Sequence, residues 1–153
     1  MIKLVNGYPN LTRSEIVDAF QEIEVDLPES YISFLLEQNG GGFETECGYV
    51  CPDDDEFQIC INCFYGISKF DSSIELLCAW SSHCHCIPDS LFPIADDGIG
   101  NQICIGVTGK YLNKLYFWNK DGEVDYGEEA TFDNIELICE SFESFIKAIQ
   151  ELK

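Results

Sequence analysis

Apolar residues recur at helical spacing near the start of the chain. One such set, spaced at i, i+3, i+4 and i+7, consists of Ile16, Ala19, Phe20 and Ile23. Thr12 and Glu15 precede this set as a capping-box pair, so we predict that a helix begins there. A second helix is predicted from Pro28 to Gln38, because proline suits a first helical turn and the glycines at 40–42 end the helix.

The pattern then changes to the alternation that is typical of strands. The runs that predict strands are residues 57–67, 91–95, 102–109 and 111–119. Residues 96–101 are predicted to form a tight turn, and residues 120–122 a hairpin turn. A short helix is predicted over Asp71–Trp80.

The end of the chain returns to helical spacing. Its periodic apolar residues are Phe142, Phe145, Ile146 and Ile149, and Ser141 is the expected cap. Helices at both ends around a central run of strands predict an α+β fold. We expect a single domain over residues 1–153, in which helices from both chain ends pack against a central, mostly antiparallel sheet.

Among the bulk properties of the sequence, net charge says most about the partners of the protein. The chain has 28 acidic and 8 basic side chains, a net charge of −20 at pH 7, and no Lys or Arg between Arg13 and Lys69. The first acidic cluster consists of Asp53, Asp54, Asp55 and Glu56. The second acidic cluster consists of Asp121, Glu123, Asp125, Glu128 and Glu129. Such charge repels nucleic acid and anionic membranes and attracts basic partners, although acidic surfaces also serve solubility.

Nine cysteines bear on the compartment of the protein. The first residues contain no apolar core of the length that a signal peptide needs, and no apolar run is long enough to cross a bilayer. An odd number of cysteines without an export signal predicts reduced thiols, which in apolar runs behave as small hydrophobic residues. We therefore expect a soluble, cytoplasmic protein.

The HCHC segment at residues 83–86 raises the alternative of a zinc site, with the pair Cys60 and Cys63 as further ligands. This pair lies in a predicted strand, where residues three apart point to opposite faces, so it does not form the knuckle that zinc requires. We therefore predict no metal and no other cofactor. If zinc is bound, its expected ligands are Cys84, His85 and Cys86.

The sequence lacks the residue patterns of an active site. Both histidines adjoin Cys84, whereas the partners of a catalytic nucleophile are normally distant in sequence. There is no serine-centred elbow, phosphate-binding glycine loop or HExxH motif. The acidic runs do not match the spacing of a calcium loop. We predict that the protein is not an enzyme.

Several motifs of ordinary composition follow one another in a particular order. They are Leu-Pro, Tyr, Phe-Leu and Asn-Gly-Gly, then Pro-Ile-Ala with Gly-x-Gly-Asn, then Tyr-Phe-Trp, and finally Ser-Phe-x-x-Phe. Their residues are Leu27, Pro28, Tyr31, Phe34, Leu35, Asn39, Gly40, Gly41, Pro93, Ile94, Ala95, Gly98, Gly100, Asn101, Tyr116, Phe117, Trp118, Ser141, Phe142 and Phe145. Over most of the chain this order resembles the SUKH superfamily, named partly for a yeast regulator of cell-wall synthesis. The HCHC segment has no counterpart in the family pattern, and Cys139 replaces an expected Ala.

The resemblance implies an α+β domain without catalytic machinery. Many bacterial members look like immunity proteins, which bind and silence a polymorphic toxin. We therefore expect this protein to bind a cognate toxin domain stoichiometrically through its two acidic clusters. Because the active sites of nucleases are basic, we expect a basic nuclease as the target. The alternatives are a regulatory protein-binding scaffold, which the resemblance to eukaryotic members implies, and a zinc or thiol sensor that uses the HCHC segment.

Overall fold

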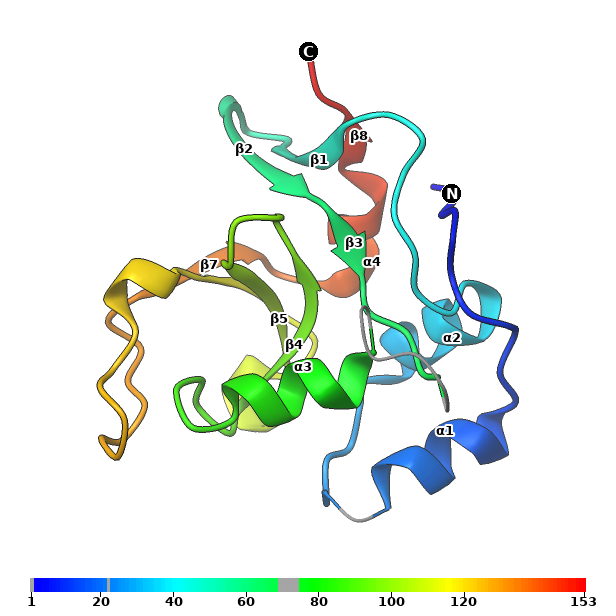
Figure 1. Ribbon diagram of the computed structural model, residues 1–153. Helices are drawn as coiled ribbons and strands as arrows, with labels where there is room; N and C mark the ends of the chain where they lie inside the picture. Colours follow the sequence, from blue (N-terminus) through cyan, green and yellow to red (C-terminus); the bar gives the residue numbers. More distant parts are fainter. Residues whose placement is uncertain (1, 22, 69–74) are drawn as a thin grey trace.

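Two antiparallel sheets and four α-helices make up the described part of the chain, residues 2–21, 23–68 and 75–153, in a computed structural model (Figure 1). The helices are α1 (Arg13–Phe20), α2 (Glu29–Glu37), α3 (Leu76–His83) and α4 (Phe142–Lys147). The strands are β1 (Cys47–Cys51), β2 (Asp54–Ile61), β3 (Cys63–Phe64), β4 (Leu91–Asp96), β5 (Gln102–Gly106), β6 (Leu115–Trp118), β7 (Ile135–Cys139) and β8 (Ile149–Glu151). The predicted α+β class with antiparallel strand pairing is confirmed.

The strands form two sheets where the sequence predicted one. The larger sheet has the order β3-β4-β5-β6-β7, and the smaller has the order β2-β1-β8. The predicted strand over residues 57–67 is divided between them, because β2 ends at Ile61 and β3 begins at Cys63. The intervening Asn62 donates its backbone N–H to the carbonyl oxygen of Asp96 at 2.8 Å. The chain therefore passes from one sheet to the other at Asn62.

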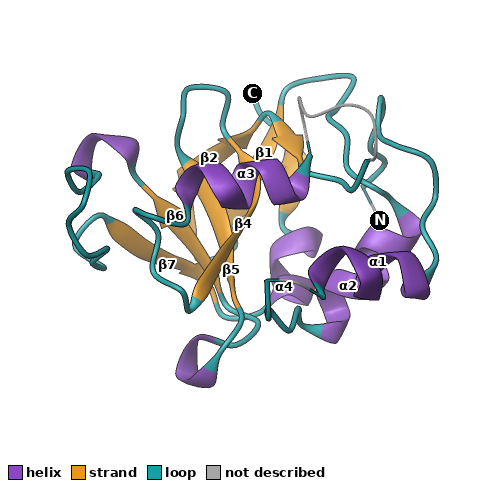
Figure 2. Ribbon diagram, turned by 60° about the horizontal axis from the view of Figure 1, so that its bottom comes forward, coloured by secondary structure: helices purple, strands orange, loops and turns teal. Residues whose placement is uncertain are grey.

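Both faces of the larger sheet are buried at its centre. On β5, Ile103 and Ile105 face the main core, whereas Cys104 between them faces a second, smaller core. The helices α1, α2 and α4 gather beside the sheet (Figure 2), and α3 packs into the same main core through Leu76 and Trp80. The smaller core is formed by Cys86, Ile87, Leu91, Cys104, Tyr116 and Trp118. The segment after α3 is therefore part of the packing of the sheet.

The helix starts predicted from local patterns are confirmed. At α1, the Thr12 hydroxyl accepts the backbone N–H of Glu15, and the Glu15 carboxylate accepts the backbone N–H of Thr12. At α4, the Ser141 hydroxyl accepts the backbone N–H of Ser144. A side-chain cap satisfies N–H groups that a helix start leaves without partners, and it stabilises a helix by about 1 kcal/mol.

The Asn-Gly-Gly motif after α2 has a structural role. The buried Asn39 donates its side-chain amide to the carbonyl oxygens of Pro9 and Ile67, at 2.8 and 3.0 Å, and its side-chain oxygen accepts the Ile67 N–H at 2.7 Å. Gly40 has a φ of +73°, and a Cβ there would lie 2.7 Å from the backbone nitrogen of Gly66. Only glycine fits this close crossing of two backbone segments.

The C-terminal helix ends earlier than predicted. Lys147 is its last residue, and Ile149 belongs to β8, where it pairs with Tyr49 of β1. Ile149 is buried in this strand, as it would be on the inner face of a helix. The apolar spacing therefore does not distinguish the two outcomes. Ile149 forms a strand because it pairs with β1, which lies about a hundred residues away in sequence.

Two predicted strands are shorter than expected. β5 ends at Gly106, and a 3₁₀-helical turn at Gly109–Tyr111 separates it from the start of β6 at Leu115. A Cβ at Gly106 would lie 1.7 Å from the carbonyl oxygen of Tyr111, so the turn folds directly back onto the strand. The Lys114 N–H donates to the same carbonyl oxygen at 3.1 Å. The strand-like pattern of this stretch therefore conceals a tight connection.

Two further local predictions were wrong in detail. The segment Lys120–Gly122 is a 3₁₀-helical turn that begins a long connection to β7, rather than a hairpin turn. It is capped by Asn119, whose side-chain oxygen accepts the backbone N–H of Asp121 at 2.9 Å. The helix predicted over Asp71–Trp80 corresponds in part to α3, and residues 71–74 lie outside the described residues. The strands β1 and β7 were not predicted.

Candidate functional site

The first acidic cluster lies at the tip of the hairpin of β1 and β2. Cys51 pairs with Asp54 across the hairpin, so Asp53 stands in the connecting turn and the other three carboxylates begin β2. All four members of the cluster are exposed. The Asp54 carboxylate accepts the backbone N–H of Glu56 at 3.2 Å. Of the four residues, Asp54 pairs with Cys51, and the register shifts between Val50 and Cys51, so the cluster stands at the irregular tip of the hairpin.

β2 extends this acidic surface beyond the cluster. Side chains alternate between the faces of a strand, and on β2 Ile59 is buried while Cys60 is partly exposed. The Cys60 thiol lies 3.8 Å from the carboxylate of Glu46, and burial, Glu46 and Asp97 together raise its pKa. Glu46 and Asp97 therefore add negative charge beside the strand. Sequence analysis missed both residues, because they come from segments that meet β2 only in the folded chain.

The second acidic cluster lies in the connection between β6 and β7. Its five carboxylates are exposed. Two asparagines close the base of this connection: the Asn119 N–H donates to the Asn134 carbonyl at 2.9 Å, and the Asn134 side chain donates to the Asn119 carbonyl at 2.8 Å. We refer to residues 119–134 as the acidic loop.

A single turn presents an aromatic side chain within the acidic loop. The Glu128 N–H donates to the Asp125 carbonyl at 3.0 Å, which closes a β-turn over residues 125–128. Gly127, in the third position of this turn, has a φ of +89°. Tyr126, in the second position, is 95% exposed. An exposed aromatic ring among carboxylates suits contact with the guanidinium group of arginine.

The structure does not join the two acidic clusters into one patch. The hairpin of β1 and β2 lies at the top of Figure 1, whereas the acidic loop projects at the lower left. Within the described part of the chain, one ion pair involves a member of either cluster: His85 Nε2 lies 3.7 Å from Glu123 Oε1. The other eight carboxylates remain available to a partner.

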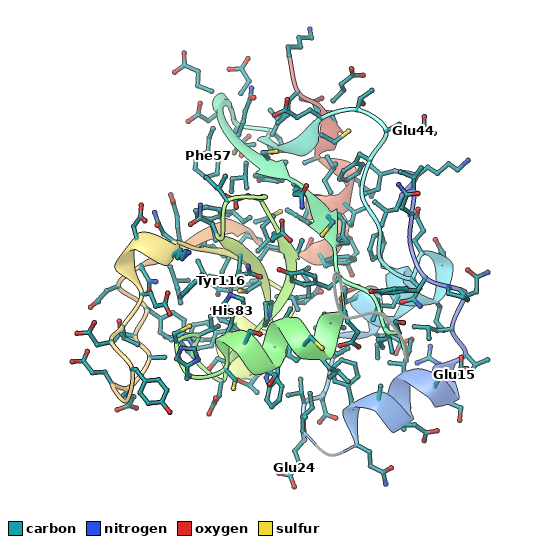
Figure 3. All side chains as sticks on the ribbon, viewed as in Figure 1. Glu15, Glu24, Glu44, Phe57, His83 and Tyr116 are labelled. Atoms are coloured by element: carbon teal, nitrogen blue, oxygen red, sulfur yellow. The ribbon has the colours of Figure 1, made fainter. Side chains whose placement is uncertain are left out.

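The HCHC segment does not converge on a single point. His83 forms a hydrogen bond through Nδ1 to the Ala79 carbonyl at 2.8 Å, and its ring lies edge-on to Trp118 with centroids 5.5 Å apart. Cys84 is exposed and its thiol contacts the Ser81 carbonyl at 3.5 Å. His83 and Tyr116 can be followed in Figure 3, where both lie near the end of α3.

His85 and Cys86 approach the acidic loop instead. The potential ligand atoms of His85, Cys86 and Glu123 all lie within 4.8 Å of one another. Cys86 is buried, and its thiol donates to the His83 carbonyl at 3.3 Å. The structure thus brings together two of the three residues that the sequence offered as zinc ligands, and it adds a glutamate from the second acidic cluster.

The buried thiols are not activated for nucleophilic chemistry. Burial, with Asp96 nearby, raises the pKa of Cys63 to about 12, and burial, with Glu123 nearby, raises the pKa of Cys86 to about 11. Burial also raises the pKa of Cys104. These thiols stay protonated at neutral pH, whereas a reactive cysteine requires a lowered pKa. Cys60 and Cys63 also make separate contacts, with Glu46 and Asp96 respectively.

The turn that resembles the SUKH pattern is likewise structural. Gly98 and Gly100 have φ values of +87° and +103°. The Asp97 carboxylate accepts the side-chain amide of Asn101 at 2.7 Å, and Asn101 in turn accepts the backbone N–H of Lys120 at 2.9 Å. These contacts join the β4–β5 turn to the start of the acidic loop.

Across the described residues, no helix is both long and apolar enough to span a membrane.

Comparison with known proteins supports the resemblance seen in the sequence. The model of the SMI1/KNR4 family (SUKH-1) matches residues 10–148. The SPbeta prophage-derived uncharacterized protein YokK of Bacillus subtilis (strain 168) is 25% identical over 158 residues, a match that covers 91% of this chain and 75% of the relative. No solved structure matches the chain.

Proposed function

This chain belongs to the SMI1/KNR4 (SUKH-1) family, and on that premise we propose that it is an immunity protein. It binds the toxin domain of a polymorphic toxin system one to one and blocks that domain. The observation that carries the proposal is the exposed negative charge of the two acidic clusters. A protein of net charge −20 presents eight carboxylates, in two clusters, that have no ion-pair partner among the described residues.

The charge suggests the chemistry of the target. A basic surface is attracted to the two acidic clusters over several ångströms, and such attraction raises association rates by about 10- to 1,000-fold at low ionic strength. A nuclease is the target that fits best, because its active site is basic in order to bind phosphate. Carboxylates that cover such a site exclude the phosphate backbone from it. Inhibition then needs contact and charge, without any catalytic step.

The state of the thiols and imidazoles supports a non-catalytic role. Cys63 and Cys86 are protonated at neutral pH, and His83 is occupied by the Ala79 carbonyl and the ring of Trp118. The hydrogen bonds of the described residues do not join Cys84 to either imidazole. A nucleophile with its base is therefore not assembled in this part of the chain.

Co-expression tests the proposal. The candidate toxin domain encoded by the neighbouring gene is induced in cells with and without this protein, and growth is scored. We expect growth to be restored, and the purified pair to form a one-to-one complex. The control is a toxin variant without activity, which should bind equally well. If an active toxin still kills cells and no complex forms, the immunity proposal is wrong and a regulatory scaffold becomes the leading account.

A further inference from the structure

Three side chains with different ligand atoms meet where α3 ends. His85 and Cys86 follow α3 directly, whereas Glu123 comes from the acidic loop. The imidazole, the thiol and the carboxylate each offer one atom, and these atoms lie within 4.8 Å of one another. His85 Nε2 lies 3.7 Å from Glu123 Oε1. Residues distant in sequence are thus brought together by the fold.

The backbone on both sides of this cluster is held in place. Cys86 is 2% exposed and packs in the smaller core with Cys104 and Trp118. Glu123 follows a 3₁₀-helical turn, and its backbone N–H donates to the Lys120 carbonyl at 3.0 Å. His85 remains partly exposed, with a side-chain exposure of 43%. The cluster therefore has a buried side, which excludes water, and an open side, through which an ion can enter.

We propose that His85, Cys86 and Glu123 bind a zinc ion, with water as the fourth ligand. Zinc accepts imidazole, thiolate and carboxylate ligands together, whereas calcium and magnesium prefer sites made of oxygen alone. Zinc–nitrogen and zinc–oxygen bonds of about 2.0–2.2 Å at a tetrahedral angle place two ligand atoms about 3.4 Å apart. The observed 3.7 Å is close to this spacing, so small side-chain rotations complete the site.

This ligand set differs from the one that the sequence offered. It keeps His85 and Cys86 and replaces Cys84 with Glu123. The Cys84 side chain is exposed, and its thiol is directed to the Ser81 carbonyl. The proposal also departs from our sequence prediction that the protein binds no metal.

Zinc in this position joins the acidic loop to the sheet. One ligand comes from the acidic loop and two come from the segment after α3, whose Cys86 packs in the smaller core. The ion therefore restrains the second acidic cluster on the surface. Zinc binding does not depend on the proposed immunity function.

The experiment uses the full chain, freed of metal and titrated with zinc in competition with a chromophoric chelator. Cobalt substitution gives an independent signal, because tetrahedral cobalt with a thiolate ligand absorbs in the visible and near ultraviolet. We expect one equivalent of zinc to bind. Cys86→Ser and Glu123→Gln should each weaken binding by about tenfold or more, since even outer-shell partners contribute that much.

Matched controls make the outcome decisive. Cys84→Ser and Glu128→Gln change a neighbouring thiol and a neighbouring carboxylate, and zinc affinity should stay within about twofold. Glu123 is exposed, so Glu123→Gln tests the site even if Cys86→Ser fails to fold. With zinc bound, amide exchange in the acidic loop should slow in the wild type but not in Glu123→Gln. Absence of binding, or binding that needs Cys84 and not Glu123, would overturn the proposal.

Discussion

The two acidic clusters carry similar charge on very different supports. The first acidic cluster stands at the tip of the hairpin of β1 and β2, whose base is paired at residues 58–61 of β2. β1 is in turn fixed to the rest of the molecule, because Tyr49 stacks on Phe145 with ring centroids 5.4 Å apart and donates its hydroxyl to the Ile138 carbonyl at 2.8 Å. The second acidic cluster stands on a long loop, held at its base by Asn119 and Asn134.

The difference suggests separate tasks in binding. Carboxylates at the tip of a hairpin whose base is fixed move together as a group, so they present a nearly constant field to an approaching partner and lose little freedom on contact. Carboxylates on a loop adapt to the partner, and Tyr126 among them offers a large contact area. The first cluster is thus suited to steering and the second to the final fit. Charge on β2, an edge strand, also discourages pairing with other chains.

The largest effect is expected from Gly48→Ala, which disturbs the hairpin that carries the first acidic cluster. A Cβ at Gly48 would lie 2.3 Å from the carbonyl oxygen of Ile59 on β2 and 2.9 Å from the side chain of Leu152. Because backbone must move to relieve this clash, we expect the free energy of unfolding to fall by about 2 kcal/mol or more. Denaturant titration measures it. An unchanged stability would mean that the hairpin is not rigidly supported.

A smaller effect is expected from Tyr126→Ala, which removes the exposed ring of the acidic loop. Affinity for the toxin domain should fall by about tenfold, or about 1.4 kcal/mol, through faster dissociation. The free energy of unfolding should be unchanged, because the ring is 95% exposed. The matched control is Val17→Ala on α1, where the side chain is 62% exposed and affinity should not change. Surface plasmon resonance with both variants measures their affinities and shows whether Tyr126 contacts the toxin domain.

The smallest effect is expected from Gly127→Ala, the counterpart of Gly48→Ala in the acidic loop. Gly127 has a φ of +89°, but a Cβ there meets no atom within 4 Å. The cost is backbone strain alone, about 1 kcal/mol, and the open loop absorbs part of it. Thermal unfolding should therefore be nearly unchanged. A loss as large as that of Gly48→Ala would show that the loop is as firmly built as the hairpin.

The helix caps were read correctly from the sequence, and the long-range strand pairings were not. The capping box of Thr12 and Glu15 involves neighbours along the chain, so its sequence pattern is sufficient. β1 was missed because Gly48 interrupts a short strand that is stabilised by partners on both sides. Ile149 was assigned to a helix because an apolar residue in that position satisfies either structure.

The same distinction applies to the candidate site. Runs of acidic residues are visible in the sequence, and their exposure follows from their charge. The approach of Glu123 to His85 and Cys86 could not be predicted, because it depends on how a long loop returns over the smaller core. The sequence offered Cys84 beside His85 and Cys86, and proximity in sequence is a poor guide to ligands that converge in space.

The most direct measurement compares the rates at which two charge-reversed variants bind the toxin domain. In one, Asp53, Asp54, Asp55 and Glu56 are changed to lysine. In the matched control, four exposed acidic residues of the α1–α2 region are changed to lysine: Asp18, Glu24, Asp26 and Glu37. Each variant gains eight charges, from −20 to −12, and the control positions lie away from the hairpin, as Glu24 does in Figure 3.

At low salt we expect the first variant to associate about tenfold more slowly or worse, and the control to lose less than about threefold. The difference should vanish at high salt, where charges are screened. Equal rates for the two variants, with both still folded, would contradict the claim that the acidic hairpin of this protein faces its toxin.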